Sequence, residues 1–464
     1  MSRGAARRAR RALVPPRAAL AVVGLFAAAA LASVTGLMVM LALAPRTGHA
    51  ATGVVTAPDV SAPTVLDFTP EELQRIQSHG PWPLPLPRDA GNALSGRTEA
   101  QALGRALFFE RGLSPAGVSC AHCHDPARAF TDGRARSVGV AELDRNAPTL
   151  LDAAHERWLG WDGAADSLWG QSIRPLLDAR EMASSPAHLK RTVASQPPLA
   201  AAWRRTFGQD AVTQGDEAVL VGVAQAMGAW VATLASGRTP FDDFRDALAR
   251  GDRAAAARYP LAAQRGLRLF VGRGNCHLCH VGPRFTHGEF ADIGLPFFVR
   301  PGVVDPGRHG GIEALKASPY NLLSRWALPR DDESVKTRHV HAEHRHFGEF
   351  KVPSLRGVAD TAPYMHDGQL PTLQAVVRHY SRLDPDRLHA DGEQLLRPLG
   401  LMAQEEDDLV TFLRTLSPKG PARPSMALGS GAGQAVPPSA GPSLNPAAPR
   451  PPSATGPPAR SSTR

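Results

Sequence analysis

The stretch Cys120-Ala121-His122-Cys123-His124 decides how this chain is interpreted, and it recurs as Cys276-His277-Leu278-Cys279-His280. Each copy has the form C-x-x-C-H, which is the attachment pattern for c-type haem. Two cysteines at this spacing can bond the two vinyl groups of one haem, and the histidine that follows can ligate the iron. A zinc site or a redox C-x-x-C is the alternative, but all four cysteines fall in these two motifs and a histidine follows each pair. The sequence therefore predicts two covalently bound haems c, with His124 and His280 as iron ligands.

The two motifs lie inside a longer internal repeat. Gly104-Arg105-Ala106-Leu107-Phe108 precedes the first motif and Phe130-Thr131-Asp132-Gly133 follows it; Gly266-Leu267-Arg268-Leu269-Phe270 and Phe285-Thr286-His287-Gly288 flank the second. Each copy predicts an amphipathic helix before the attachment site and a Phe-Thr turn after it. We therefore expect an all-α fold with two cytochrome c-like haem domains related by duplication.

Other helices are predicted where the sequence provides start signals. Thr69-Pro70-Glu71-Glu72 combines an N-cap, a proline and acidic residues at the start of one helix. Residues 218–234 are largely apolar, and a third helix follows the acidic stretch at 405–408. The proline-rich stretch at 81–87 reads as an extended arm.

The expected domain organisation follows these elements. It comprises a signal peptide or membrane anchor at 1–50, a linker and extended arm at 51–90, and an N-terminal haem domain at 91–255. A C-terminal haem domain follows at 256–420. The tail at 421–464 is rich in Pro, Ala, Gly and Ser and is expected to be disordered.

The N-terminus carries an export signal. Six arginines precede an uncharged apolar run at 19–43, and Gly48-His49-Ala50 offers a small-residue cleavage site. The run is also long enough to span a bilayer, so a retained anchor is the alternative to cleavage. In both cases the haem domains are expected in the periplasm.

The net charge of +9 does not indicate nucleic-acid binding. Seven arginines in the leader and four in the tail contribute eleven positive charges, and removing them from +9 leaves about two net negative charges. The part between is near neutral, so no nucleic-acid partner is expected.

From about residue 91 to 417 the chain resembles the bacterial di-haem cytochrome c peroxidases, including the MauG-type enzymes. The matching blocks are R-N-A-P-T at 145–149, W-D-G at 161–163, Gln171, E-M at 181–182, K-V-P-S-L-R at 351–356, T-A-P-Y-M-H-D-G at 361–368 and V-R-H-Y at 377–380. The leader, residues 301–346 and the tail lie outside the resemblance.

The resemblance implies that the haem ligated by His124 is the peroxidatic one, with Glu181 and Gln171 on its distal side. A carboxylate there can move a proton between the oxygens of hydrogen peroxide. Many members carry a distal histidine in the loop before R-N-A-P-T, but residues 137–141 read S-V-G-V-A, and the nearest downstream histidine is His155. We therefore expect an open first haem, as in MauG-type members.

The resemblance also implies that the haem ligated by His280 transfers electrons. Its sixth ligand in the family is Met or Tyr, and Tyr380 matches this position better than its competitor Met365. Trp161 matches the family tryptophan between the haems, whereas Trp158 and Trp169 are interpreted as core residues. One calcium ion is implied, with Asn146, Thr361 and Pro363 at its ligand positions.

The predicted function is the reduction of hydrogen peroxide with electrons from a small cytochrome c or cupredoxin, passed through the second haem. One alternative is a MauG-type enzyme that uses peroxide to oxidise a protein or another substrate. A second alternative is an electron carrier without catalytic activity. Residues 301–346 are expected to form a solvated insertion loop near the second haem. A metal site is the less favoured interpretation of its histidines, which are His339, His341, His344 and His346.

Overall fold

The computed structural model of the protein describes residues 64–89, 91–296, 298–328, 331–388, 391–392 and 395–418. These residues are mostly helical, in agreement with the expected class. The predicted leader and tail lie outside them. Within the described ranges, no helix has both the length and the apolar character needed to cross a membrane.

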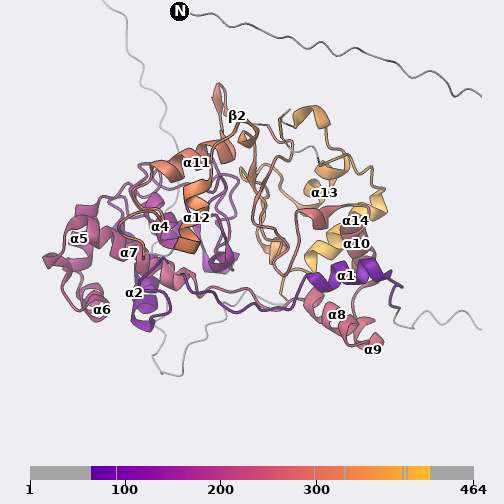
Figure 1. Ribbon diagram of the computed structural model, residues 1–464, viewed down its shortest axis with the longest axis horizontal. Helices are drawn as coiled ribbons and strands as arrows, with labels where there is room; N and C mark the ends of the chain where they lie inside the picture. Colours follow the sequence, from indigo (N-terminus) through magenta and orange to yellow (C-terminus); the bar gives the residue numbers. More distant parts are fainter. Residues whose placement is uncertain are drawn as a thin grey trace, which may run out of the picture. The chain divides into compact units, whose positions relative to one another are not determined.

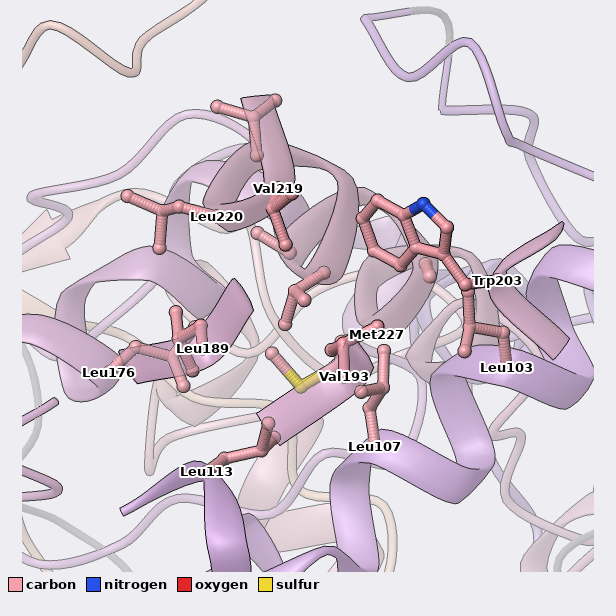
Figure 2. Packing of buried hydrophobic residues seen from close by; sticks show 14 of the residues in the cluster. Leu103, Leu107, Leu113, Leu176, Leu189, Val193, Trp203, Val219, Leu220 and Met227 are labelled. Atoms are coloured by element: carbon pink, nitrogen blue, oxygen red, sulfur yellow. The ribbon is translucent and has the colours of Figure 1, made fainter. Parts of the chain in front are cut away.

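A first group of helices surrounds α7 (Asp216–Val231) (Figure 1). Its other members are α2 (Thr98–Phe109), α4 (Leu168–Leu177), α5 (Pro186–Ser195) and α6 (Pro197–Phe207). Every residue from 219 to 231 of α7 is buried, as expected for a helix that is apolar on all faces. Leu107, Val193 and Met227 lie close together in this core (Figure 2). The predicted helix at 218–234 is thus confirmed as the centre of the first group.

A second group of helices forms a separate core. It contains α1 (Pro70–Ser78), α8 (Pro240–Ala249), α9 (Arg253–Ala256), α10 (Leu261–Val271), α13 (Leu373–Ser381) and α14 (Ala403–Arg414). Helix α1 starts with the predicted cap, since Thr69 and Glu72 form a reciprocal capping box. The sequence predicts that the first haem domain extends to residue 255. Helix α8 lies before this boundary, but its Phe241 and Phe244 are buried in the second core.

The glycine in each repeat allows two helices to cross closely. A Cβ at Gly104 of α2 would lie 1.9 Å from the carbonyl oxygen of Ala226 in α7. A Cβ at Gly266 of α10 would lie 2.0 Å from the carbonyl oxygen of Asp408 in α14. No side chain fits at either crossing, so the two matching sequence positions have matching packing roles.

Residues 301–346 are not the solvated loop beside the second haem that the sequence predicts. They contain β3 (Val303–Val304), α11 (Gly307–Ala317) and α12 (Asp331–His339), and β3 pairs with β2 (Phe298–Arg300). Tyr320 and Trp326 pack against the first core, and Thr337 Oγ1 donates a 2.7 Å hydrogen bond to Asp166. The segment therefore covers the first helix group. Its end leads to β4 (Phe350–Lys351), which pairs antiparallel with β1 (Phe290–Ala291).

Candidate haem sites and the cavity between them

The first C-x-x-C-H motif forms the short helix α3 (Cys120–Cys123), with His124 at its end. The Nδ1 atom of His124 lies 3.0 Å from the carbonyl oxygen of Phe130. Because that carbonyl can only accept, this contact favours the proton on Nδ1 and makes Nε2 the nitrogen that would bind a metal; the backbone of Pro148 is a second hydrogen-bonding neighbour of the ring. Phe130 has a φ of 59°, a left-handed conformation that belongs to the Phe-Thr turn.

The second motif repeats this arrangement on a 3₁₀ turn, Cys276–Leu278, instead of an α-helix. His280 Nδ1 lies 2.9 Å from the carbonyl oxygen of Phe285, whose φ is 55°. Burial lowers the pKa of His280 to about 4, so the imidazole is neutral, as a metal ligand must be. The sequence predicts both Phe-Thr turns. It does not reveal that the turns orient the histidines, because the contacts are made by the backbone carbonyls of Phe130 and Phe285.

Both motifs line one cavity of about 1660 Å³. No disulfide links the four cysteines, and burial raises the pKa of Cys120 to about 12 and that of Cys123 to about 11. Paired thiols, a neutral imidazole oriented through Nδ1 and a large cavity fit the binding of haem c at each motif. His124 and His280 are the residues that would hold the two irons.

Glu181 and Gln171 lie in the wall of this cavity together with His124. Gln171 comes from α4, and its Oε1 is buried without a hydrogen-bond partner among the described residues. Burial and the neighbouring Asp178 raise the pKa of Glu181 to about 7, against the opposing effect of Arg174 and Arg180. A carboxyl group with this pKa can both accept and release a proton near neutral pH.

The loop at 137–141, in which the sequence shows no histidine, holds the backbone beside Glu181. Val140 N donates to the carbonyl oxygen of Glu181 at 2.9 Å, and Ala141 N donates to that of Arg180 at 2.9 Å. Ser137 and Gly139 also line the cavity. The loop therefore positions the candidate distal carboxylate through backbone contacts that the sequence does not reveal.

Trp161 lies in the cavity wall, and its Nε1 donates a 2.9 Å hydrogen bond to the carbonyl oxygen of Asn146. The carbonyl oxygen of Trp161 in turn accepts from Lys351 N at 2.8 Å. The predicted calcium residues Asn146, Thr361 and Pro363 line the same cavity. Asn146 Nδ2 donates to the carbonyl oxygen of Arg134, so its side-chain oxygen is the group that could bind a cation.

Tyr380, on α13, and Met365 both line the cavity. Burial, with Cys276 and Cys279 nearby, raises the pKa of the Tyr380 phenol well above its usual range. Because the structure brings both side chains to the cavity, the choice of sixth ligand stays a prediction. Trp169 is fully buried in the first core, as predicted. Trp158 is 2% exposed but lines the cavity and belongs to none of the core clusters of the described residues, so its interpretation as a core residue is wrong.

The histidines of the segment at 339–346 do not converge. His339, His341 and His346 line the cavity, whereas His344 pairs with Asp391 at 2.8 Å. Within the described ranges, no group of three His, Cys, Asp or Glu side chains is arranged to hold a metal ion. We therefore assign no metal site to this segment.

Comparisons with known proteins show which family the chain resembles. The sequence profile described as "Di-haem cytochrome c peroxidase" matches residues 98–250. The chain is 33% identical over 365 residues to the methylamine utilization protein MauG of Methylorubrum extorquens, covering 78% of this chain and 90% of that protein. It is 34% identical over 332 residues to the cytochrome-c peroxidase IdrP2 of a Pseudomonas species, covering 70% and 83% of the two chains.

Solved structures show the same likeness. The diheme peroxidase BthA from Burkholderia thailandensis matches with a TM-score of 0.55 and 26% identity over 70% of this chain and 87% of that chain. A MauG-like protein associated with microbial copper homeostasis matches with a TM-score of 0.55 and 26% identity, covering 73% and 96%. The predicted family and the predicted class of oxidoreductase are confirmed. The chain belongs to the di-haem cytochrome c peroxidase family.

Proposed function

We propose that the protein reduces hydrogen peroxide at the site of His124, with Glu181 as the proton-transfer group and Gln171 as a hydrogen-bonding partner of the peroxide. The observation that carries this proposal is a carboxyl group with a pKa near 7 in the same cavity wall as an unpaired amide oxygen. Haem bound at His124 would supply the redox-active iron. Glu181 accepts the proton of one peroxide oxygen and returns it to the other, so that water leaves.

Electrons enter at the site of His280 and pass Trp161 to reach the first site. Trp161 supports this route because it lines the shared cavity and is tied through its backbone to Lys351 of β4. Tyr380 is the preferred sixth ligand of the second haem, since a phenol oxygen would stabilise its ferric state. The electron donor is a small cytochrome c or cupredoxin in the periplasm, to which the N-terminal leader directs the chain.

The structure also supports a calcium ion held by Asn146, Thr361 and Pro363, because these oxygen-bearing residues share the cavity wall. Removing calcium with a chelator should lower peroxide turnover, and calcium, but not magnesium, should restore it. Persistence of full turnover in chelator-treated, calcium-free protein would exclude the calcium site.

The matching glycine crossings and Phe-Thr turns support an origin of the two haem units by duplication.

A MauG-type reaction, in which peroxide oxidises a protein or another substrate, is the second candidate. The loop at 137–141 favours it, because this loop carries no histidine that could close the first haem. The two similar proteins above carry the names of the two candidates, since one is a MauG and the other a cytochrome-c peroxidase. The two candidates share the first site and differ in where the electrons come from.

Electron paramagnetic resonance of the oxidised protein tests the common basis. One high-spin and one low-spin ferric signal are expected, from an open first haem and a six-coordinate second haem. Two low-spin signals would contradict an open site and favour a carrier without peroxide chemistry. Steady-state turnover with reduced cytochrome c then separates the candidates, because fast oxidation supports the peroxidase and slow oxidation supports the MauG-type reaction.

A further inference from the structure

Trp158 lies in the cavity wall three residues before Trp161, and three cations surround its ring. The guanidinium of Arg308 lies 4.3 Å from the ring centroid, Lys336 Nζ 5.3 Å and the guanidinium of Arg157 5.5 Å. Carboxylates partly offset these charges. Trp158 Nε1 donates a 3.3 Å hydrogen bond to Glu289, and Glu289, Asp162 and Glu349 each favour the charged form of Arg308. Glu289 itself pairs with Arg157 at 2.7 Å.

Two of these cations are fixed by the segment at 301–346. Arg308 of α11 is 3% exposed and lies between Trp158 and the ring of Phe290, at 4.0 Å from the latter. It donates to the carbonyl oxygens of Asp162 at 3.2 Å and Gly163 at 2.9 Å. Burial lowers its pKa to about 10, which leaves it charged at neutral pH.

Lys336 of α12 is held by two backbone carbonyls. Its Nζ donates to the carbonyl oxygen of Arg157 at 2.6 Å and to that of Asp166 at 3.0 Å. The positive charge therefore has a fixed place beside Trp158 and is not a mobile surface group. The segment that lacks a counterpart in the family resemblance supplies two of the three charges.

The environment of Trp161 is different. Among the described residues, no arginine or lysine lies over its ring. Its Nε1 donates to a neutral backbone carbonyl, and nearby Arg145 is compensated by Asp162 and Asp305, each at 2.6 Å. The two tryptophans of this cavity wall thus differ: three cations lie over the ring of Trp158, and none among the described residues lies over that of Trp161.

Losing an electron gives an indole ring a positive charge. Cations over the face of the neutral ring are attracted to it, but they repel the oxidised ring. We propose that Arg308, Lys336 and Arg157 keep Trp158 reduced and thereby confine electron transfer between the haem sites to Trp161. This inference rests on the peroxide reaction proposed above.

The chemistry that tests it is peroxide reduction without a donor. An indole then supplies both electrons. The oxygen of one water molecule adds to the ring with loss of two protons, and the peroxide takes up these two protons and the two electrons to give two water molecules. The net change is tryptophan plus hydrogen peroxide giving hydroxytryptophan plus water. Peptide mass spectrometry reports the site of the added oxygen.

We would compare Lys336→Met, which removes the charge, with Lys336→Arg, which keeps it. Excess peroxide should add oxygen at Trp158 about tenfold more often in Lys336→Met than in the native protein, since a unit charge about 5 Å away is lost. Lys336→Arg should behave as the native protein. Arg325→Met is the matched control, because Arg325 lies 4.7 Å from the ring of Trp326 and leaves Trp158 untouched.

A cyanide-blocked sample of each variant measures direct oxidation that does not involve the haem sites. An unchanged amount of oxidised Trp158 in Lys336→Met, with peroxide turnover intact, would overturn the inference. If the native protein did not turn over peroxide at all, the proposed function would be overturned instead. If Lys336→Met does not fold, Arg157→Met provides the same test, with the same tenfold increase expected at Trp158 and an unchanged amount contradicting the inference.

Discussion

At the scale of the residue, Glu181 is the group whose behaviour depends most on its surroundings. Its carboxyl group must be ionised to accept a proton, and its pKa is raised to about 7. We therefore predict that kcat/KM for peroxide falls as the pH drops below about 7 and reaches a plateau above it. Glu181→Gln should lower kcat/KM by about 10²–10⁴-fold and remove this pH dependence.

Stopped-flow measurement of peroxide consumption between pH 5 and 9 checks this prediction. Asp178→Asn provides the control, because Asp178 contributes to the raised pKa of Glu181. Its removal should shift the midpoint to lower pH and leave the plateau rate in place. Native activity in Glu181→Gln would show that another group transfers the proton.

Tyr380 supports a second prediction, concerning the iron coordinated by His280. Tyr380→Phe removes the candidate oxygen ligand, so the low-spin ferric signal should become high-spin. Tyr380→Met should remain low-spin with a higher reduction potential, because a thioether favours ferrous iron. Both changes are measured by electron paramagnetic resonance and spectroelectrochemistry.

Tyr364→Phe is a matched control, since Tyr364 also lines the cavity but donates its hydroxyl to the carbonyl oxygen of Val358 at 3.0 Å. It should leave both signals unchanged. A low-spin signal that persists in Tyr380→Phe and disappears in Met365→Leu would identify Met365 as the ligand.

Which residues could be predicted from sequence depends on where their chemistry comes from. The cysteines and histidines of the two motifs carry their chemistry in their spacing, so they are visible in the sequence. The pKa of Glu181 arises from burial, and the orientation of His124 arises from the carbonyl of Phe130. Neither depends on a side-chain pattern, so neither could be predicted.

At the scale of the element, the crossing of α10 and α14 offers a test in which two effects have opposite signs. Alanine normally stabilises a helix interior by about 1 kcal/mol relative to glycine. At Gly266, however, its Cβ would lie 2.0 Å from the carbonyl oxygen of Asp408. We predict that Gly266→Ala lowers the free energy of unfolding by about 1–3 kcal/mol, because the helices must separate.

Chemical denaturation of the haem-loaded protein checks this value. Gly215→Ala is the control, because no atom lies within 4 Å of a Cβ placed there and its φ is −66°. Its effect should stay within about 1 kcal/mol, as expected for an N-cap position. A stabilising effect of Gly266→Ala would mean that the crossing can relax.

Helices were predictable where local signals define them and not where distant contacts do. Helices α1 and α14 start with capping and acidic residues, and α7 is a continuous apolar stretch. The position of α11 and α12 instead depends on a buried Arg308 between two aromatic rings and on Asp166. A buried arginine reads as a surface residue in the sequence, so this segment was predicted as a solvated loop.

At the scale of the whole molecule, a buried ion cluster joins the sequence regions of the two motifs. Glu156, from the first region, accepts from Arg284 and from Lys351 Nζ, the latter at 2.9 Å. The three side chains are 10–11% exposed. Lys351 also donates its backbone N–H to Trp161, so the cluster connects the proposed electron route to both regions.

We predict that Glu156→Gln lowers the free energy of unfolding by about 3–5 kcal/mol, because it leaves two buried cations without their carboxylate. Denaturant unfolding of the haem-loaded protein measures this change. The control is Asp210→Asn, which breaks an exposed pair with Arg204 and should change stability by less than about 1 kcal/mol. In Glu156→Gln,Lys351→Met, where one of the two cations is removed as well, part of the loss should be recovered. If Glu156→Gln matched the exposed control, the cluster would be too well solvated to hold the two regions together.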